Sequence, residues 1–233
     1  MMRKARWIAL CGAVVALLVG WVATSGEQPA APAATSEVQP SAPVPGRLNV
    51  AILVHEGVEL LDFAGPGEVF GVSRSFNVFT VATSRQPVTS LRFVTVTPQY
   101  TLDDHPPADI VIVPGGQTQV PMADPQVRAW LQRVAPRARV VLSVCTGAFL
   151  LAQAGLLDGL EATTHHSSID SLRGMAPHTR VVADRRFVDN GKVITAAGIS
   201  AGIDASLHVV EKLKGREEAE RIAGYMEYRW QRE

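Results

Sequence analysis

One cysteine in the middle of the chain lies in a pattern that can support nucleophilic chemistry. Residues 139–144 form a short, largely apolar and β-branched run, which is the pattern of a buried parallel strand. Cys145 follows directly, and after it come Thr146, Gly147 and a helical run over 148–154. A cysteine at a sharp strand-to-helix turn has the outline of a nucleophile elbow. Because the helix start directs N–H groups and a positive dipole end at the sulfur, we expect a thiol of low pKa that acts as a nucleophile.

Two further ionisable side chains are candidates to act with this cysteine. A short strand predicted over 160–164 is followed by His165 and His166, and it can return an imidazole to the same edge of the sheet. His165 would then act as a base or an orienting partner, as in other cysteine–histidine pairs. Asp62 follows two leucines and precedes a phenylalanine. A carboxyl in such apolar surroundings has a raised pKa and can hold or donate a proton near neutral pH.

Backbone groups and one loop complete the candidate site. Gly115 and Gly116 follow a predicted strand and let backbone N–H groups approach a ligand closely. Together with the N–H of Thr146 they can form an anion hole. The glycine-rich loop at 195–204 opens a helix with Ser200 as its expected N-cap, and this loop can line the pocket.

Each of these residues also has a purely structural interpretation. A lone cysteine after an apolar strand is often a small buried hydrophobe. Asp62 can be an ordinary residue of a helix N-terminus, His165 a polar cap at a strand end, and Ser200 a plain helix cap. The sequence pattern by itself leaves these alternatives open, and a double glycine is also a common turn.

The elements that must position these residues alternate between strands and helices. Nearly continuous apolar strands that alternate with helices predict an α/β domain with a mainly parallel sheet. Sites in such sheets lie at the carboxyl ends of the strands, where the candidates above collect. The predicted strands cover 48–54, 76–82, 109–113, 139–144, 160–164, 179–183, 186–188 and 192–196, with a hairpin arm at 91–97. The predicted helices cover 59–72, 123–134, 148–154, 200–213 and 216–230.

Composition excludes several classes of function. Lys+Arg and Asp+Glu are balanced at 22 each, aromatic residues make up 6% of the chain, and no basic block is present, so we expect no nucleic-acid partner. The two cysteines are Cys11 and Cys145, and they form no CxxC or Cys/His cluster with zinc spacing. We therefore expect no metal.

The N-terminus has the pattern of an export signal. Three basic residues within the first six precede an unbroken apolar run over 7–23, and small residues up to Ser25 suit cleavage after that position. We expect an exported, periplasmic protein whose only contact with a membrane is this segment, either cleaved or retained as an inner-membrane tether. The expected organisation is a signal peptide or membrane anchor at 1–25, a Pro/Ala-rich linker at 26–46 and one domain at 47–233.

Four segments carry a resemblance to a known family. Residues 47–228 resemble the ThiJ/PfpI family, and within it the branch that holds isonitrile hydratases and the ligand-sensing domains of AraC-type regulators. The resemblance implies a class I glutamine amidotransferase-like fold, related to the flavodoxin-like folds: a single domain built as a three-layer sandwich around the sheet. The segments are LLDFAGPGEVF (60–70), IVIVPGG (110–116), SVCTGAFLLAQAGLLDGLEATTHH (143–166) and ITAAGISAGIDASLHVVEKL (194–213).

The resemblance also implies roles for the candidate residues. Cys145 would be the nucleophile, Asp62 the acidic partner that shuttles a proton, and His165 a histidine near the cysteine. Gly116 and Thr146 would supply N–H groups to the anion hole. The implied activity is that of a cofactor-independent lyase, which adds water to an isocyanide and releases an N-substituted formamide. A homodimer acting on a small-molecule substrate is the corresponding expectation.

Because the sequence departs from the family pattern, two other functions remain as alternatives. His166 stands where hydratase-like members often carry tryptophan, which predicts a more polar pocket. One alternative is a non-catalytic ligand or redox sensor that uses Cys145, for which we expect no DNA-binding role. Another is a glyoxalase- or deglycase-like cysteine hydrolase, which shares the nucleophile and differs in substrate.

Overall fold

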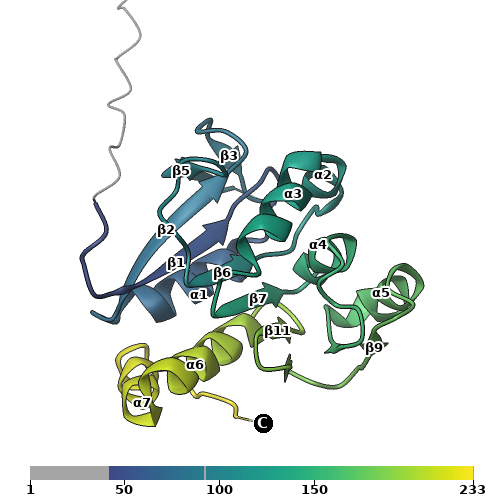
Figure 1. Ribbon diagram of the computed structural model, residues 1–233. Helices are drawn as coiled ribbons and strands as arrows, with labels where there is room; N and C mark the ends of the chain where they lie inside the picture. Colours follow the sequence, from purple (N-terminus) through teal and green to yellow (C-terminus); the bar gives the residue numbers. More distant parts are fainter. Residues whose placement is uncertain (1–41, 92, 233) are drawn as a thin grey trace, which may run out of the picture. The chain divides into compact units, whose positions relative to one another are not determined.

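The computed structural model describes residues 42–91 and 93–232, which belong to one compact unit within Val38–Glu233. Its centre is a seven-stranded sheet in the order β10-β11-β7-β6-β1-β2-β5 (Figure 1). All neighbouring strands in this sheet run parallel except β10, which is antiparallel to β11. The seven strands are β1 (Leu48–Leu53), β2 (Phe76–Ala82), β5 (Tyr100–Thr101), β6 (Ile110–Val113), β7 (Val140–Val144), β10 (Phe187–Asp189) and β11 (Val193–Ala196).

Helices cover both faces of the sheet, so the predicted three-layer α/β sandwich is confirmed. One hydrophobic core joins the sheet to α1, α6 and α7, and a second core joins its other face to α3, α4 and α5. The helices are α1 (Leu60–Gly71), α2 (Gln119–Ala123), α3 (Pro125–Val134), α4 (Gly147–Gln153), α5 (Ile169–Met175), α6 (Ala201–Lys214) and α7 (Arg216–Tyr225). The strands β6 and β7 are buried at every position, as the continuous apolar runs predict.

Local signals in the sequence explain several boundaries. The side chain of Asp124 caps α3 by accepting a hydrogen bond from the Gln126 N–H at 2.8 Å, and Pro125 occupies the first helical position. The hairpin arm near 91–97 is confirmed as the antiparallel pair β3 (Val88–Thr89) and β4 (Thr95–Val96).

Two predicted elements differ from the structure. The strand expected over 160–164 is reduced to β8 (Glu161–Ala162), which pairs with β9 (Arg180–Val181) outside the main sheet. The helix expected over 216–230 ends at Tyr225, because Glu227 adopts a left-handed φ of 50° and the following chain turns back to bond with α6. A short 3-10 helix, η1 (His166–Ser168), links β8 to α5.

The predicted export segment at 1–25 and most of the linker at 26–46 lie outside the described residues. Within residues 42–91 and 93–232, no helix combines the length and apolar character needed to cross a bilayer.

Candidate active site

Cys145 lies in a strained elbow between β7 and α4. Its φ is 58°, a left-handed conformation that non-glycine residues rarely adopt and that tends to mark functional sites. Its N–H donates to the Ala196 carbonyl at 3.1 Å, which continues the pairing of β7 with β11. At Gly147 the helix start passes so close to β6 that an added Cβ would lie 1.9 Å from the Val113 carbonyl oxygen. The elbow therefore depends on glycine at this position.

Asp62 approaches the sulfur from the first turn of α1. The carboxyl group is 0% exposed, and its Oδ2 accepts a hydrogen bond from the Gly115 N–H at 3.1 Å. Its other oxygen, Oδ1, has no hydrogen-bond partner of good geometry among the described residues. The thiol of Cys145 lies against this carboxyl, and their contact affects the pKa of both groups. Asp62 is thus a buried acid in contact with the nucleophile, and one of its oxygens is available to take a proton.

Burial raises the pKa of both members of this pair. The pKa of Asp62 rises to about 7, because desolvation outweighs the opposing hydrogen bond from Gly115, and the nearby charge of Glu59 adds to the rise. The pKa of Cys145 rises to about 12, because its own burial is reinforced by the Asp62 carboxylate. The N–H of Thr146 lowers the pKa of the thiol, but by less than these two effects raise it. The low thiol pKa expected from the elbow pattern is therefore wrong.

The two raised pKa values determine which group of the Cys145–Asp62 pair carries a proton at a given pH. Between the two pKa values Asp62 is ionised and Cys145 remains a thiol, so the pair carries one negative charge. The carboxylate can accept the thiol proton as the sulfur attacks an electrophile, because a base with a pKa near 7 is suited to proton transfer at neutral pH. The arrangement supports nucleophilic catalysis by a thiol with an adjacent general base.

A tight loop over 197–200 closes the site from the side of β11. Gly198 lies directly on the nucleophile, since a Cβ there would be 3.3 Å from the Cys145 Sγ, and its φ of 134° also favours glycine. Ile199 has a φ of 46°, which is a true outlier for a β-branched residue. A hydrogen bond from the Ile199 backbone lowers the pKa of Asp62. This loop therefore contacts both members of the pair, and sequence inspection identified it only as a glycine-rich loop.

The expected anion hole is arranged differently from the prediction. The Gly115 N–H is used by Asp62, and the Gly116 N–H donates to the Thr146 Oγ1 at 3.0 Å. The backbone N–H of Thr146 is directed at the Cys145 sulfur instead. All three N–H groups therefore bond within the site. Those of Gly115 and Gly116 are engaged by side chains, and that of Thr146 is directed at the sulfur.

His165 and Ser200 are also placed differently from the prediction. The Nδ1 of His165 is 2.8 Å from the Ser167 Oγ, and its ring lies 4.3 Å from that of His166, whereas no contact with Cys145 is recorded within the described residues. Ser200 takes the N-cap position of α6 but makes no side-chain cap bond there. The residue that does reach the elbow from this region is Thr164, whose Oγ1 donates to the Cys145 carbonyl at 2.8 Å.

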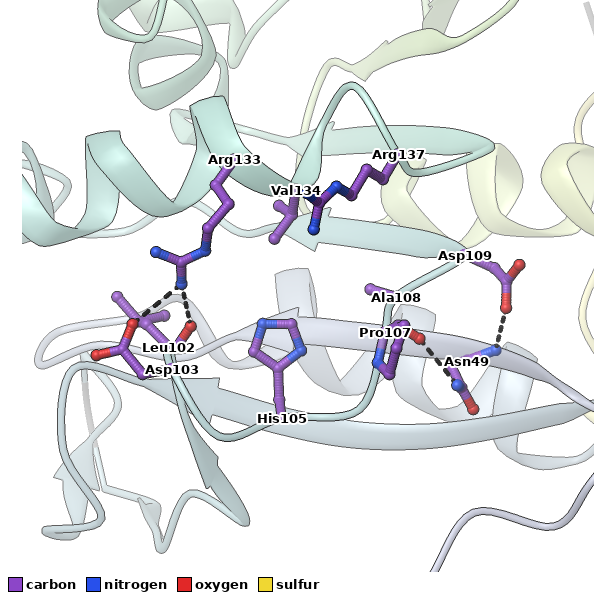
Figure 2. Close-up of a pocket in the computed structure, with 10 residues that line it drawn as sticks. All are labelled: Asn49, Leu102, Asp103, His105, Pro107, Ala108, Asp109, Arg133, Val134 and Arg137. Carbon is purple, nitrogen blue, oxygen red and sulfur yellow. Dashed lines mark hydrogen bonds and ion pairs between the residues drawn. The ribbon is translucent and has the colours of Figure 1, made fainter.

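Two of the cavities lie at opposite ends of the sheet strands. One, of about 330 Å³, adjoins the elbow and is lined by Thr163, Thr164, His166 and Ala197, among others. Figure 2 shows another, of about 380 Å³, at the amino ends of β1 and β6 near the end of α3. There both nitrogens of His105 are engaged, one with the Pro106 carbonyl and the other with the Trp130 N–H. No group of three or more potential metal-ligating side chains occurs in the described part of the chain.

Comparison with known proteins assigns the chain to a family. The sequence profile of the DJ-1/PfpI family matches residues 48–212. The chain belongs to the DJ-1/PfpI family. Isonitrile hydratase from Pseudomonas putida is 36% identical over 185 residues, which cover 78% of each protein. The HTH-type transcriptional regulator GbdR from Pseudomonas aeruginosa is 32% identical over 122 residues, or 52% of this chain and 33% of the regulator. This DJ-1/PfpI domain is thus similar both to an enzyme and to part of a regulator.

One solved structure supports the same family assignment, and a second shares the fold. The crystal structure of a ThiJ/PfpI family protein from Pseudomonas syringae superposes with a TM-score of 0.74 at 33% identity, covering 78% of this chain and 76% of that one. An AraC family transcriptional regulator from Pseudomonas putida superposes with a TM-score of 0.69 at 20% identity, covering 77% of this chain and 99% of that one, and this likeness concerns the fold alone.

Proposed function

We propose that this DJ-1/PfpI protein is a cofactor-independent cysteine enzyme that hydrates a small electrophile, with isonitriles as the substrate class. The observation that carries the proposal is the buried pair of Cys145 and Asp62, a thiol in contact with a carboxyl whose pKa is about 7. The likeness to an isonitrile hydratase over most of both chains supports the choice of substrate.

The proposed reaction begins with attack of the Cys145 sulfur on the terminal carbon of R–N≡C. The thiol proton passes to the Asp62 carboxylate and then to that carbon, giving a thioformimidate, R–N=CH–S–Cys. Water adds to the same carbon, and Asp62 takes one of its protons and passes it to the nitrogen. Cleavage of the C–S bond, with transfer of the remaining hydroxyl proton through Asp62 to the sulfur, then releases the N-substituted formamide and returns the thiol, so water is the only co-reactant.

The state of the sulfur favours catalysis over redox sensing. Redox-sensor cysteines are exposed thiols of low pKa, because the thiolate is the form that oxidants attack. Cys145 is 7% exposed and its pKa is raised to about 12. A neighbouring base that generates the thiolate only during attack suits an enzyme better than a sensor.

The proposed activity predicts formamide release that depends on Cys145. The purified chain is incubated with alkyl and aryl isonitriles, and formamide is quantified by NMR against a Cys145→Ala variant. Multiple turnovers by the wild type and none by the variant are expected. A stoichiometric adduct without turnover would refute hydration and favour a ligand sensor, whereas turnover of methylglyoxal alone would favour the glyoxalase- or deglycase-like alternative.

We propose that the enzyme acts outside the cytoplasm as a homodimer, on the grounds of the sequence at 1–25 and the family resemblance. A fusion of residues 1–46 to alkaline phosphatase, which is active only after export, is expected to be active in a bacterial host. An inactive fusion would contradict export. A monomer mass by light scattering would contradict the dimer.

A further inference from the structure

A second buried carboxylate, Asp204, takes no part in the proposed reaction. It lies in the first turn of α6 and is 0% exposed. Its Oδ2 accepts a hydrogen bond from the Arg186 Nε at 2.6 Å, and a second nitrogen of this guanidinium also contacts it. Its Oδ1 accepts from the Gln231 N–H at 2.8 Å. Both oxygens are thus satisfied, as a buried charge requires, and they join α6 to the approach to β10 and to the C-terminal segment.

The C-terminal segment over 226–232 is fastened to the same turn of α6. The Trp230 Nε1 donates to the Asp204 carbonyl at 3.2 Å, and the Tyr228 hydroxyl donates to the Ser200 carbonyl at 3.4 Å. Both rings pack against the core beneath α6. Arg186 reaches the loop as well, because its Nη2 lies 3.4 Å from the Ser200 Oγ and its carbonyl accepts from the Ala197 N–H at 2.8 Å.

The first turn of α6 also lies against the elements that carry both reacting groups. A Cβ on Gly202 would lie 2.8 Å from Val144, the last residue of β7 before Cys145. Ile203 lies against Gly65 of α1, where a Cβ would be 2.9 Å from the Ile203 Cγ1. A shift of this turn would therefore change the relation between the elbow and the helix of Asp62.

The loop over 197–200, which precedes α6, needs support from its surroundings because its backbone is strained. A left-handed φ at a β-branched residue is unfavourable and persists only where packing and hydrogen bonds over-determine it. Ile199, with its φ of 46°, is immediately preceded by Gly198 on the sulfur and followed by Ser200, which Arg186 and Tyr228 both contact. The bonds that hold this loop therefore converge on Asp204 and its partners.

We propose that Asp204, Arg186 and Trp230 form a clamp that holds the loop over 197–200 in its strained conformation against the Cys145 sulfur. These three are positioning residues, because they touch neither the sulfur nor the acid. The inference deepens the proposed function, since it names further residues on which the same pair depends.

The clamp has a consequence for access to the sulfur. Cys145 is 7% exposed, and Gly198 covers it, since a Cβ there would be 3.3 Å from the Cys145 Sγ. Releasing the loop therefore exposes the sulfur to water and to reagents. Because hydration favours the thiolate, the thiol is expected to react faster when the clamp is broken.

The prediction is tested by alkylation of Cys145 with iodoacetamide as a function of pH. The full chain carries Cys11→Ser so that Cys145 is its one remaining thiol. In Asp204→Asn the pH profile of the alkylation rate is expected to move down by about 0.5–1 pH unit, with a rate at pH 7 that is about 3–10-fold higher. Trp230→Phe, which removes one N–H donor, should move the profile in the same direction by less.

The matched control is Asp189→Asn. Asp189 also joins β10 to α6, through His208 at 2.8 Å and Lys212 at 2.9 Å, and among the described residues it has no hydrogen bond to the loop. Its loss should lower stability and leave the pH profile of alkylation in place. An unchanged profile in folded Asp204→Asn and Trp230→Phe, or an equal shift in Asp189→Asn, overturns the clamp. If Asp204→Asn fails to fold, Trp230→Phe decides. Because alkylation needs no isonitrile, the result does not depend on whether hydration is found.

Discussion

Replacing Asp62 with Asn is expected to stabilise the folded domain above pH 7. In the folded protein the pKa of Asp62 is about 7, against 3.8 for the ordinary group. The native state therefore binds a proton more tightly than the unfolded chain, and this contribution to stability is fully present below pH 3.8 and is lost as the pH rises through 7. The loss amounts to up to about 4 kcal/mol at pH 8. Asn does not titrate, so Asp62→Asn escapes this loss.

The same substitution is expected to lower kcat for the proposed hydration by about 10²–10⁴-fold, because an amide cannot accept the thiol proton. Denaturant midpoints between pH 4 and 8 would measure the stability, and initial rates of formamide release would measure the activity. Asp170→Asn is the matched control, since Asp170 is an exposed carboxylate that pairs with Arg173 among the described residues and should change both quantities little. A variant less stable than wild type at pH 8, or one that retains full activity, would contradict the role given to Asp62.

Replacing Gly147 with Ala is expected to destabilise the domain by at least about 3 kcal/mol, because a methyl group cannot coexist with the Val113 carbonyl 1.9 Å away. Backbone on both sides must move, and this backbone includes the elbow itself. Loss of Cys145 reactivity should therefore accompany the loss of stability.

The matched control for this prediction is Gly174→Ala in α5. A Cβ at Gly174 meets nothing within 4 Å, so alanine should stabilise that helix by about 0.5–1 kcal/mol. Chemical denaturation of both variants at one pH measures the difference. Equal stabilities for Gly147→Ala and wild type would show that the elbow tolerates a side chain and that the close approach is not required.

The sheet and the elbow were predictable because their signals are local. Continuous apolar runs predict buried parallel strands, and the change from β-branched residues to Cys145, Thr146 and Gly147 locates the turn. The contact between Asp62 and the sulfur followed only from the family resemblance, since nothing near 62 in the sequence shows which residue its carboxyl meets.

The features that sequence did not reveal depend on distant contacts. The thiol pKa was expected to be low from the helix start alone, but it depends on burial and on a carboxylate from another helix. The return of the C-terminal segment to Asp204 depends on the left-handed φ of Glu227 and on bonds across 26 and 27 residues. His165 was assigned to the site from the strand expected over 160–164 and from the family resemblance, whereas Thr164 is the residue whose side chain reaches the elbow.

The raised pKa of Cys145 also affects how long the protein stays active before its nucleophile is oxidised. Because burial and the Asp62 carboxylate raise the pKa of Cys145, most of the sulfur is held as the thiol at pH 7. Peroxides and disulfides react with the ionised form, so the resting nucleophile is spared the slow conversion to sulfenic and sulfinic acids that inactivates exposed, acidic cysteines. The carboxylate that activates the sulfur during attack thus also preserves it between encounters with substrate, and the working lifetime of the protein in oxidising surroundings should be long for that reason.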